Sequence, residues 1–269
     1  DGIGKHTSEK LASDGGYALL VHGRKDPEDS NVKSLIRDLE SRGASKVAYL
    51  QADLSDLEQV DGLAERAIQQ LQLWQSTESP AFPSLDVLLN NAGVFDPDAR
   101  HSAQGYDNTM AINVLAPFVL TRKLLPSLVH GENARIVTTS SISQSSRLPD
   151  VDALFARRLD NGKDYDVQPL SYSAHSSYSY SKLGDLLFTV QLSKLLANYQ
   201  LDNTATSANV KNSQKFLDNM HRIQCLTMDP GTVNTKMLLA GWGACGISVK
   251  KANNTYKLAT GEEYAFGRV

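Results

Sequence analysis

The sequence predicts an α/β fold, a doubly wound parallel sheet within a single domain spanning residues 1–269. Two observations predict it. Short apolar runs alternate along the chain with longer segments whose apolar residues recur at helical spacing. The 269 residues are 41% hydrophobic and 21% charged, an ordinary balance for a globular protein. A chain of this length can bury a substantial core without disulfides or metals.

The first half of the chain supplies three strand candidates and two helix candidates. An apolar run at 17–21 follows a Gly-Gly pair and predicts a buried strand. Residues 32–42 carry apolar side chains on one side and predict a helix. Residues 46–51 predict the next strand, and 56–74 repeat apolar residues at helix period. The apolar run 85–89 predicts a third strand.

The second half repeats the same alternation. Long helices are expected at 110–129 and 179–199, and strands at 135–139 and 223–228. Short apolar strands separated by helices of ten or more residues favour a parallel sheet covered on both faces. Right-handed crossovers then give a Rossmann-like layout.

Two segments carry loop composition. Residues 76–84 hold two prolines and three serines and predict a surface loop. Residues 202–216 are polar and rich in Asn, Ser and Thr, which predicts a mobile insertion. The first residues, 1–7, have the form of the end of a glycine-rich turn entering a helix.

Charge and composition exclude several function classes. The chain has 27 Lys and Arg against 30 Asp and Glu, so nucleic acid is not the expected partner. The two cysteines, Cys225 and Cys245, exclude a disulfide framework and a cysteine-rich zinc site. No membrane span, no signal peptide and no metal site are expected, and the expected location is cytoplasmic.

Small and polar residues follow the predicted strands. Asn90-Asn91-Ala92-Gly93 comes directly after the strand at 85–89, which suits either a close backbone approach to a ligand or a plain turn. Tyr178 and Lys182 stand four residues apart, on one face of a helix. A lysine ammonium beside a phenol favours the phenolate. A tyrosine tuned in this way can donate or accept a proton near neutral pH.

The motifs together resemble those of the short-chain dehydrogenase/reductase family. They cover nearly the whole chain in the family's order, and the segment after Tyr178 looks most like the retinol dehydrogenase and WW-domain oxidoreductase branch. The motifs are Gly2-Ile3-Gly4, Asn90-Asn91-Ala92-Gly93, Asn113, Ser140-Ser141, Tyr178-x-x-x-Lys182 and Pro230-Gly231-x-Val233-x-Thr235.

The resemblance implies an oxidoreductase that transfers a hydride between a nicotinamide coenzyme and an alcohol or carbonyl substrate. Tyr178 would be the general acid or base, and Lys182 would assist it and hold the nicotinamide ribose. Ser141, rather than Ser140, would orient the substrate oxygen, and Asn113 would hold a water that passes protons towards Lys182.

The resemblance also implies the coenzyme contacts. Asp53 and Leu54 would flank the adenine, although Asp53 has the alternative role of capping the following turn. The remaining expected contacts are Gly2, Ile3 and Gly4 at the pyrophosphate, Asn90, Asn91, Ala92 and Gly93 after the third strand, Tyr178 and Lys182 at the ribose, and Pro230, Gly231, Val233 and Thr235 near the nicotinamide.

The residues after the first predicted strand favour NADP(H) over NAD(H). Gly23 stands where an NAD enzyme usually places an acidic residue for the ribose 2′-hydroxyl, and Arg24 follows it. A guanidinium in place of a carboxylate favours a 2′-phosphate through its charge and its bidentate geometry. Asp26 nearby argues mildly for NAD(H).

The chain departs from the family pattern at its start, where the earlier glycine and the strand before it are not present. The domain is therefore expected to be N-terminally truncated, with unpaired edges on the strands beside the missing one. A non-catalytic nucleotide-binding or scaffold protein and an extended sugar-nucleotide epimerase are the alternatives. The resemblance further implies a lipophilic substrate and a homodimer or homotetramer formed through the two long helices.

Overall fold

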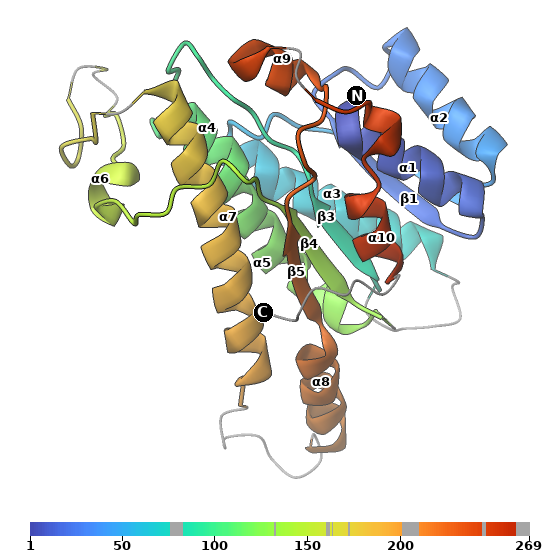
Figure 1. Cartoon of the computed structure of the whole chain (residues 1–269). Helices are drawn as coiled ribbons and strands as arrows, with labels where there is room; N and C mark the ends of the chain where they lie inside the picture. The colour runs from blue at the N-terminus through green and yellow to red at the C-terminus, as the bar shows by residue number, and fades with distance from the viewer. Residues whose placement is uncertain are drawn as a thin grey trace.

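Parallel strands form the centre of the structure, which is a computed structural model (Figure 1). It describes residues 1–75, 83–131, 133–159, 162, 164–171, 173–200, 210–243 and 246–261, with side chains described from residue 215 onward in the segment 210–222. The strands are β1 (Ala18–Gly23), β2 (Lys46–Gln51), β3 (Val87–Asn90), β4 (Arg135–Thr139) and β5 (Gln224–Met228).

The strands form two parallel sheets that share hydrophobic clusters. β1 pairs with β2, with Val21 opposite Tyr49. The second sheet has the order β3-β4-β5, with Ile136 opposite both Leu88 and Cys225. In the described part of the chain, β1 and β3 each keep one unpaired edge.

Helices cover the sheets in two layers (Figure 1). One layer holds α1 (Gly2–Asp14), α2 (Ser30–Arg42) and α10 (Asn254–Thr260), which pack against one another through α1. The other holds α3 (Leu57–Trp74), α5 (Ala116–Val129) and α7 (Ala174–Ala197). Parallel strands with helices in two layers are the doubly wound α/β arrangement that the sequence predicts.

Side chains from both sheets meet in the same clusters and so hold the layers together. Leu20 of β1 and Leu88 of β3 pack against the buried residues Ala64, Ala67 and Leu124. A second cluster joins β4 to the helices beneath it. Its buried members are Leu128, Val129, Ala134, Ile136, Leu196, Met220 and Ile223.

Polar caps explain why two long helices begin earlier than the apolar pattern predicts. Ser173 Oγ accepts a hydrogen bond from Ser176 N at 3.2 Å, so α7 begins at Ala174 rather than at residue 179. Asp107 Oδ1 accepts from Met110 N at 2.9 Å, so the predicted helix 110–129 begins at α4 (Asn108–Met110). A π-helical turn, Ala111–Leu115, then joins α4 to α5.

The mobile insertion predicted for 202–216 is wrong from residue 210 onward. Residues Val210–Arg222 form helix α8, which packs against α7 and α5. Phe216 packs on the cluster around Leu128, and Met220 is buried within it. Burial of these side chains outweighs the polar composition of the segment. Residues 201–209, and 76–82 of the other predicted loop, lie outside the described residues.

One helical stretch in the described residues is long and apolar enough to cross a membrane. It is Asn108–Val129, with a mean hydropathy of 1.3 over its most apolar window. Half of that window is buried inside the structure, where α5 packs against α3 and β3. Helices in the cores of soluble proteins can be equally long and apolar, so this stretch is weak support for a membrane span.

We expect Leu128→Ala to lower the free energy of unfolding by about 2–5 kcal/mol, because Leu128 is fully buried and its removal leaves a cavity. Leu73→Ala is the matched control, since Leu73 is a helical leucine that is 77% exposed, and it should change stability by less than about 0.5 kcal/mol. Urea unfolding followed by circular dichroism measures both. Equal losses in the two variants would contradict the placement of this core.

Candidate active site

Helix α7 brings Tyr178 and Lys182 together on its buried face. The two side chains belong to consecutive turns, and Lys182 Nζ lies 5.8 Å from the centroid of the Tyr178 ring. Tyr178 is 5% exposed and Lys182 3% exposed. The ammonium and the phenol therefore share one poorly solvated environment, which strengthens their electrostatic interaction.

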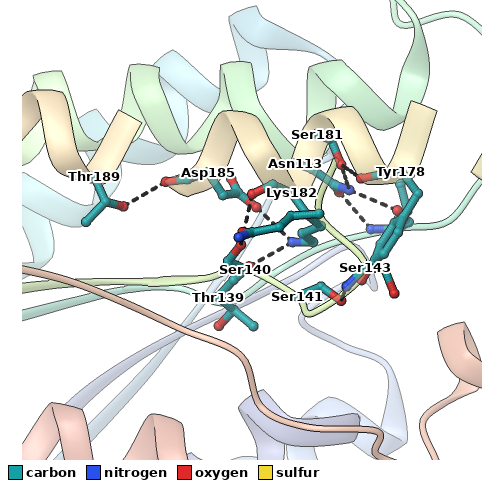
Figure 2. A network of polar contacts seen from close by, with 12 residues as sticks. Asn113, Thr139, Ser140, Ser141, Ser143, Tyr178, Ser181, Lys182, Asp185 and Thr189 are labelled. Atoms are coloured by element: carbon teal, nitrogen blue, oxygen red, sulfur yellow. Dashed lines mark hydrogen bonds and ion pairs between the residues drawn. The ribbon is translucent and has the colours of Figure 1, made fainter. Parts of the chain in front are cut away.

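The Lys182 ammonium is held by two acceptors (Figure 2). Nζ donates to the Thr139 carbonyl oxygen at the end of β4 and to Asp185 Oδ2, each at 2.8 Å. Burial raises the pKa of Asp185 to about 6, although Lys182 acts in the opposite direction. Sequence reasoning missed Asp185. Its signal was an acidic residue three positions after the lysine, which places both side chains on the same face of the helix.

The two serines after β4 have different partners. Ser140 Oγ donates to the Lys182 carbonyl oxygen at 2.8 Å, so its hydroxyl anchors α7 to the sheet. Ser141 Oγ accepts from Ser143 N at 3.1 Å, which leaves its hydroxyl proton free to point elsewhere. Ser145 N, further along this loop, donates to the Ser179 carbonyl oxygen at 3.0 Å. These bonds hold the loop that carries Ser141 against the start of α7 (Figure 2).

Asn113 ties three parts of the site together from the π-helical turn. Its Oδ1 accepts from Val94 N at 2.8 Å, and its Nδ2 donates to the Val94 carbonyl oxygen at 3.0 Å. Nδ2 also donates to Ser181 Oγ on α7 at 2.9 Å. A Cβ on Gly93 would lie 3.5 Å from both Asn113 Oδ1 and Lys182 Nζ. The turn after β3 therefore passes directly beside the Tyr178–Lys182 pair.

Several expected coenzyme residues meet at the first turn of α1. Ile3 and Gly4 are helical, and Gly2, where the helix starts, has φ +62°, a left-handed conformation. A Cβ on Gly4 would lie 2.8 Å from Asn91 Nδ2, and one on Gly2 would lie 3.6 Å from Thr235 Cγ2. The missing side chains at these glycines let Asn91 and Thr235 pack closely around the start of the helix, and a helix N-terminus suits a pyrophosphate.

The Pro230–Thr235 segment leads from β5 into α9 (Lys236–Trp242). Gly231 has φ +79°, a left-handed conformation that glycine adopts without strain. Val233 is buried and bridges Ile247. Thr235 Oγ1 accepts from Leu238 N at 3.3 Å and caps α9.

The residues expected around the adenosine part of the coenzyme follow β1 and β2. Arg24 is exposed after β1, and a Cβ on Gly23 would lie 2.6 Å from the Tyr49 hydroxyl oxygen, so that position has no room for a carboxylate. Asp53 Oδ1 accepts from Ser55 N at 2.9 Å, which is the capping role considered as its alternative. The Leu54 side chain is buried in the core.

Two aromatic side chains pack against Tyr178, and His175 packs against both of them. Trp242 of α9 lies 5.3 Å from the Tyr178 ring and Phe95 lies 6.2 Å from it, measured between centroids. His175 packs 4.8 Å from Phe95 and 5.2 Å from Trp242. The sequence patterns do not predict this cluster, because its members lie far apart in the chain.

Comparison with known proteins identifies the class. Residues 1–153 match the family model described as short chain dehydrogenase. The human polyprenol dehydrogenase is 30% identical over 239 residues, which cover 87% of this chain and 58% of that protein. The human retinol dehydrogenase 12 is 28% identical, with 79% of this chain and 59% of that protein covered. The chain thus spans less than two thirds of the length of these relatives.

Solved structures show the same fold. A short-chain dehydrogenase of Shigella flexneri 2a complexed with NADP aligns with a TM-score of 0.61 and 19% identity, covering 96% of this chain and 87% of that chain. A metagenomic short-chain oxidoreductase in complex with NADP aligns with a TM-score of 0.54 and 19% identity, covering 97% and 84%. The chain belongs to the short-chain dehydrogenase/reductase family, as its motifs predict.

We expect Gly4→Ala to weaken NAD(P) binding by about tenfold or more, because the new methyl group displaces Asn91 and narrows the helix N-terminus. Alanine favours a helix over glycine by about 1 kcal/mol, so the fold itself should not suffer. Gly62→Ala on α3 is the matched helical control. Fluorescence titration with the coenzymes measures the effect. Unchanged affinity in Gly4→Ala would place the pyrophosphate elsewhere.

Proposed function

We propose that the protein is an NADP(H)-dependent oxidoreductase that interconverts an alcohol and a carbonyl compound. The observation that carries this proposal is the buried Tyr178–Lys182 pair beside Ser141 and the turn at Gly93. When bound, the nicotinamide supplies or accepts the hydride. The protein contributes placement, electrostatics and the path of the proton.

Tyr178 exchanges the proton with the substrate oxygen. In reduction its hydroxyl donates, and in oxidation its phenolate accepts. The Lys182 ammonium stabilises the phenolate, since a nearby positive charge favours the ionised form. The Ser141 hydroxyl donates to the substrate oxygen and orients it, while Ser140 keeps its bond to α7. Asn113 holds the turn after β3 in register with Lys182.

The coenzyme would lie across the ends of the strands, where open α/β sheets bind ligands. Gly2, Ile3 and Gly4 would meet the pyrophosphate at the start of α1, where Asn91 packs closely against Gly4. The turn at Asn90, Asn91, Ala92 and Gly93 and the Pro230–Thr235 segment flank this point, and Lys182 would hold the nicotinamide ribose. Asp53 and Leu54 would lie beside the adenine, and Arg24 beside the 2′-phosphate.

The aromatic cluster of Phe95, His175 and Trp242 supports a lipophilic substrate. Flat apolar rings next to the reacting hydroxyl favour an apolar ligand over a charged one. Leu239, an exposed apolar side chain on the same helix as Trp242, adds to this surface. The relatives named for polyprenol and retinol have lipophilic alcohols in their names, which agrees with this chemistry.

A non-catalytic nucleotide-binding protein that keeps the fold is the second candidate function. The observation that favours it is the unpaired edge on β1 and on β3, among the described residues, because a sheet interrupted there supports α1 less firmly. The presence of Asn113, Ser141, Tyr178 and Lys182 together favours the enzyme.

We expect Tyr178→Phe to lower kcat about 100-fold or more in NADPH oxidation with a panel of lipophilic carbonyls, because it removes the general acid. Tyr180→Phe on the same helix is the matched control and should retain activity. Equal rates in Tyr178→Phe and the wild type would reject the enzyme in favour of the second candidate.

We expect the wild type to bind NADPH more tightly than NADH, and Arg24→Ala to lose about tenfold or more of its NADPH affinity while its NADH affinity stays unchanged. The guanidinium contributes only where a 2′-phosphate is present. Lys25→Ala is the control, since Lys25 pairs with Asp29 at 3.0 Å. Calorimetric titration with both coenzymes decides the matter, and tighter binding of NADH by the wild type would refute the preference.

A further inference from the structure

Asp185 is a buried acidic residue to which the motifs assign no role. It lies on α7 one turn beyond Lys182, is 2% exposed, and accepts a hydrogen bond from Lys182 Nζ at 2.8 Å (Figure 2). A buried carboxylate carries a large desolvation cost, which a surface position would avoid. The carboxylate contacts the Lys182 ammonium directly, and a role for Asp185 is therefore to be argued from this contact.

The donors of the Lys182 ammonium can be counted. An ammonium group has three N–H donors. One is used by the Thr139 carbonyl oxygen and one by Asp185 Oδ2. One donor remains for a ribose hydroxyl or a water beside Gly93, whose Cβ position lies 3.5 Å from Nζ. The two bonds thus fix the direction of the third.

The charge of Asp185 acts against that of Lys182. The ammonium stabilises a negative phenolate at Tyr178, whose ring centroid is 5.8 Å from Nζ. A carboxylate bound to the same ammonium cancels part of that stabilisation. Removing the carboxylate while keeping the side chain's shape would therefore leave the phenolate more favoured.

The other groups packed against α7 add little charge at this point. In the described chain, Lys182 is the charged group that acts on Asp185. β4 presents the Thr139 carbonyl, the π-helical turn presents Asn113, and Asp107 before α4 is bonded to Ser177 Oγ. β5 presents Cys225, whose thiol stays neutral because burial raises its pKa to about 12. α8 presents His221 at the far end of α7, against Tyr199.

We propose that Asp185 is a positioning residue that holds the Lys182 ammonium in place. Its negative charge also reduces the electrostatic effect of the ammonium on Tyr178. The proposal rests on the proposed function, in which Tyr178 exchanges a proton with the substrate. Asp185 itself touches neither substrate nor coenzyme. It acts through Lys182, both by the direction of the third N–H donor and by the net charge of the pair.

The test is the pH profile of alcohol oxidation in the wild type, Asp185→Asn and Asp185→Ser. Both variants remove the charge, and asparagine keeps the shape. We expect the rising limb of kcat/KM to move to lower pH by about 1 unit in each, because the uncompensated ammonium favours the phenolate. Asp185→Glu retains the carboxylate and should stay close to the wild type. Asp61→Asn, which breaks the surface pair between Lys123 and Asp61, should not move the limb.

A second readout does not depend on turnover. Burial raises the pKa of Asp185 from 3.8 to about 6, so its contribution to stability is fully present below about pH 3.8 and is lost as the pH rises to about 6. The melting temperature of the wild type minus that of Asp185→Asn should therefore fall over this range. A difference that stays constant or rises with pH overturns the proposed environment of Asp185.

The outcomes separate the two proposals. If Tyr178→Phe is inactive and the Asp185→Asn profile superimposes on that of the wild type, the proposed function stands and the role of Asp185 is overturned. If Tyr178→Phe is fully active, both fail. If neither neutral variant folds while Asp61→Asn does, Asp185 is a structural residue and the positioning role is overturned.

Discussion

Lys182 joins helix α7 to the end of β4 through both its side chain and its main chain. Nζ donates to the Thr139 carbonyl oxygen, and the Lys182 carbonyl oxygen accepts from Ser140 Oγ, each at 2.8 Å. These bonds set the depth and rotation of α7 against the sheet. The positions of Tyr178 on one side and Asp185 on the other follow from that placement, because all three residues lie on one rigid helix.

A second constraint comes from Asn113 in the π-helical turn. A regular helix here would shift its side chains by one position, and π-bulges occur often at functional sites for this reason. Through this turn Asn113 bonds both main-chain groups of Val94 and the Ser181 hydroxyl. The turn after β3, the helix α7 and the π-helical turn before α5 are thus joined at one buried amide, which costs little because each of its polar atoms has a partner.

The aromatic cluster shows how distant segments complete the site. Phe95 follows β3, His175 lies in the first turn of α7, and Trp242 ends α9. The ring centroids nevertheless lie 4.8 Å apart for Phe95 and His175, 5.1 Å apart for Phe95 and Trp242, and 5.3 Å apart for Tyr178 and Trp242. Edge-to-face contacts of this kind hold flat apolar surfaces at fixed angles. The Tyr178 phenol is 5% exposed and lies in a poorly hydrated space, where the ammonium of Lys182 acts more strongly on it.

The sequence by itself determined the alternation of strands and helices and the order of the motifs. Apolar periodicity and the glycine and polar residues that separate the elements are local properties of the chain. It therefore placed β2 and β4 at their observed bounds and put Tyr178 and Lys182 on one helix face. Only the tertiary structure decided that residues 210–222 form α8, that Asp185 binds Lys182, and that Trp242 reaches Tyr178. Each of these depends on burial and on contacts between elements that are far apart in the chain. Local sequence patterns do not predict such contacts.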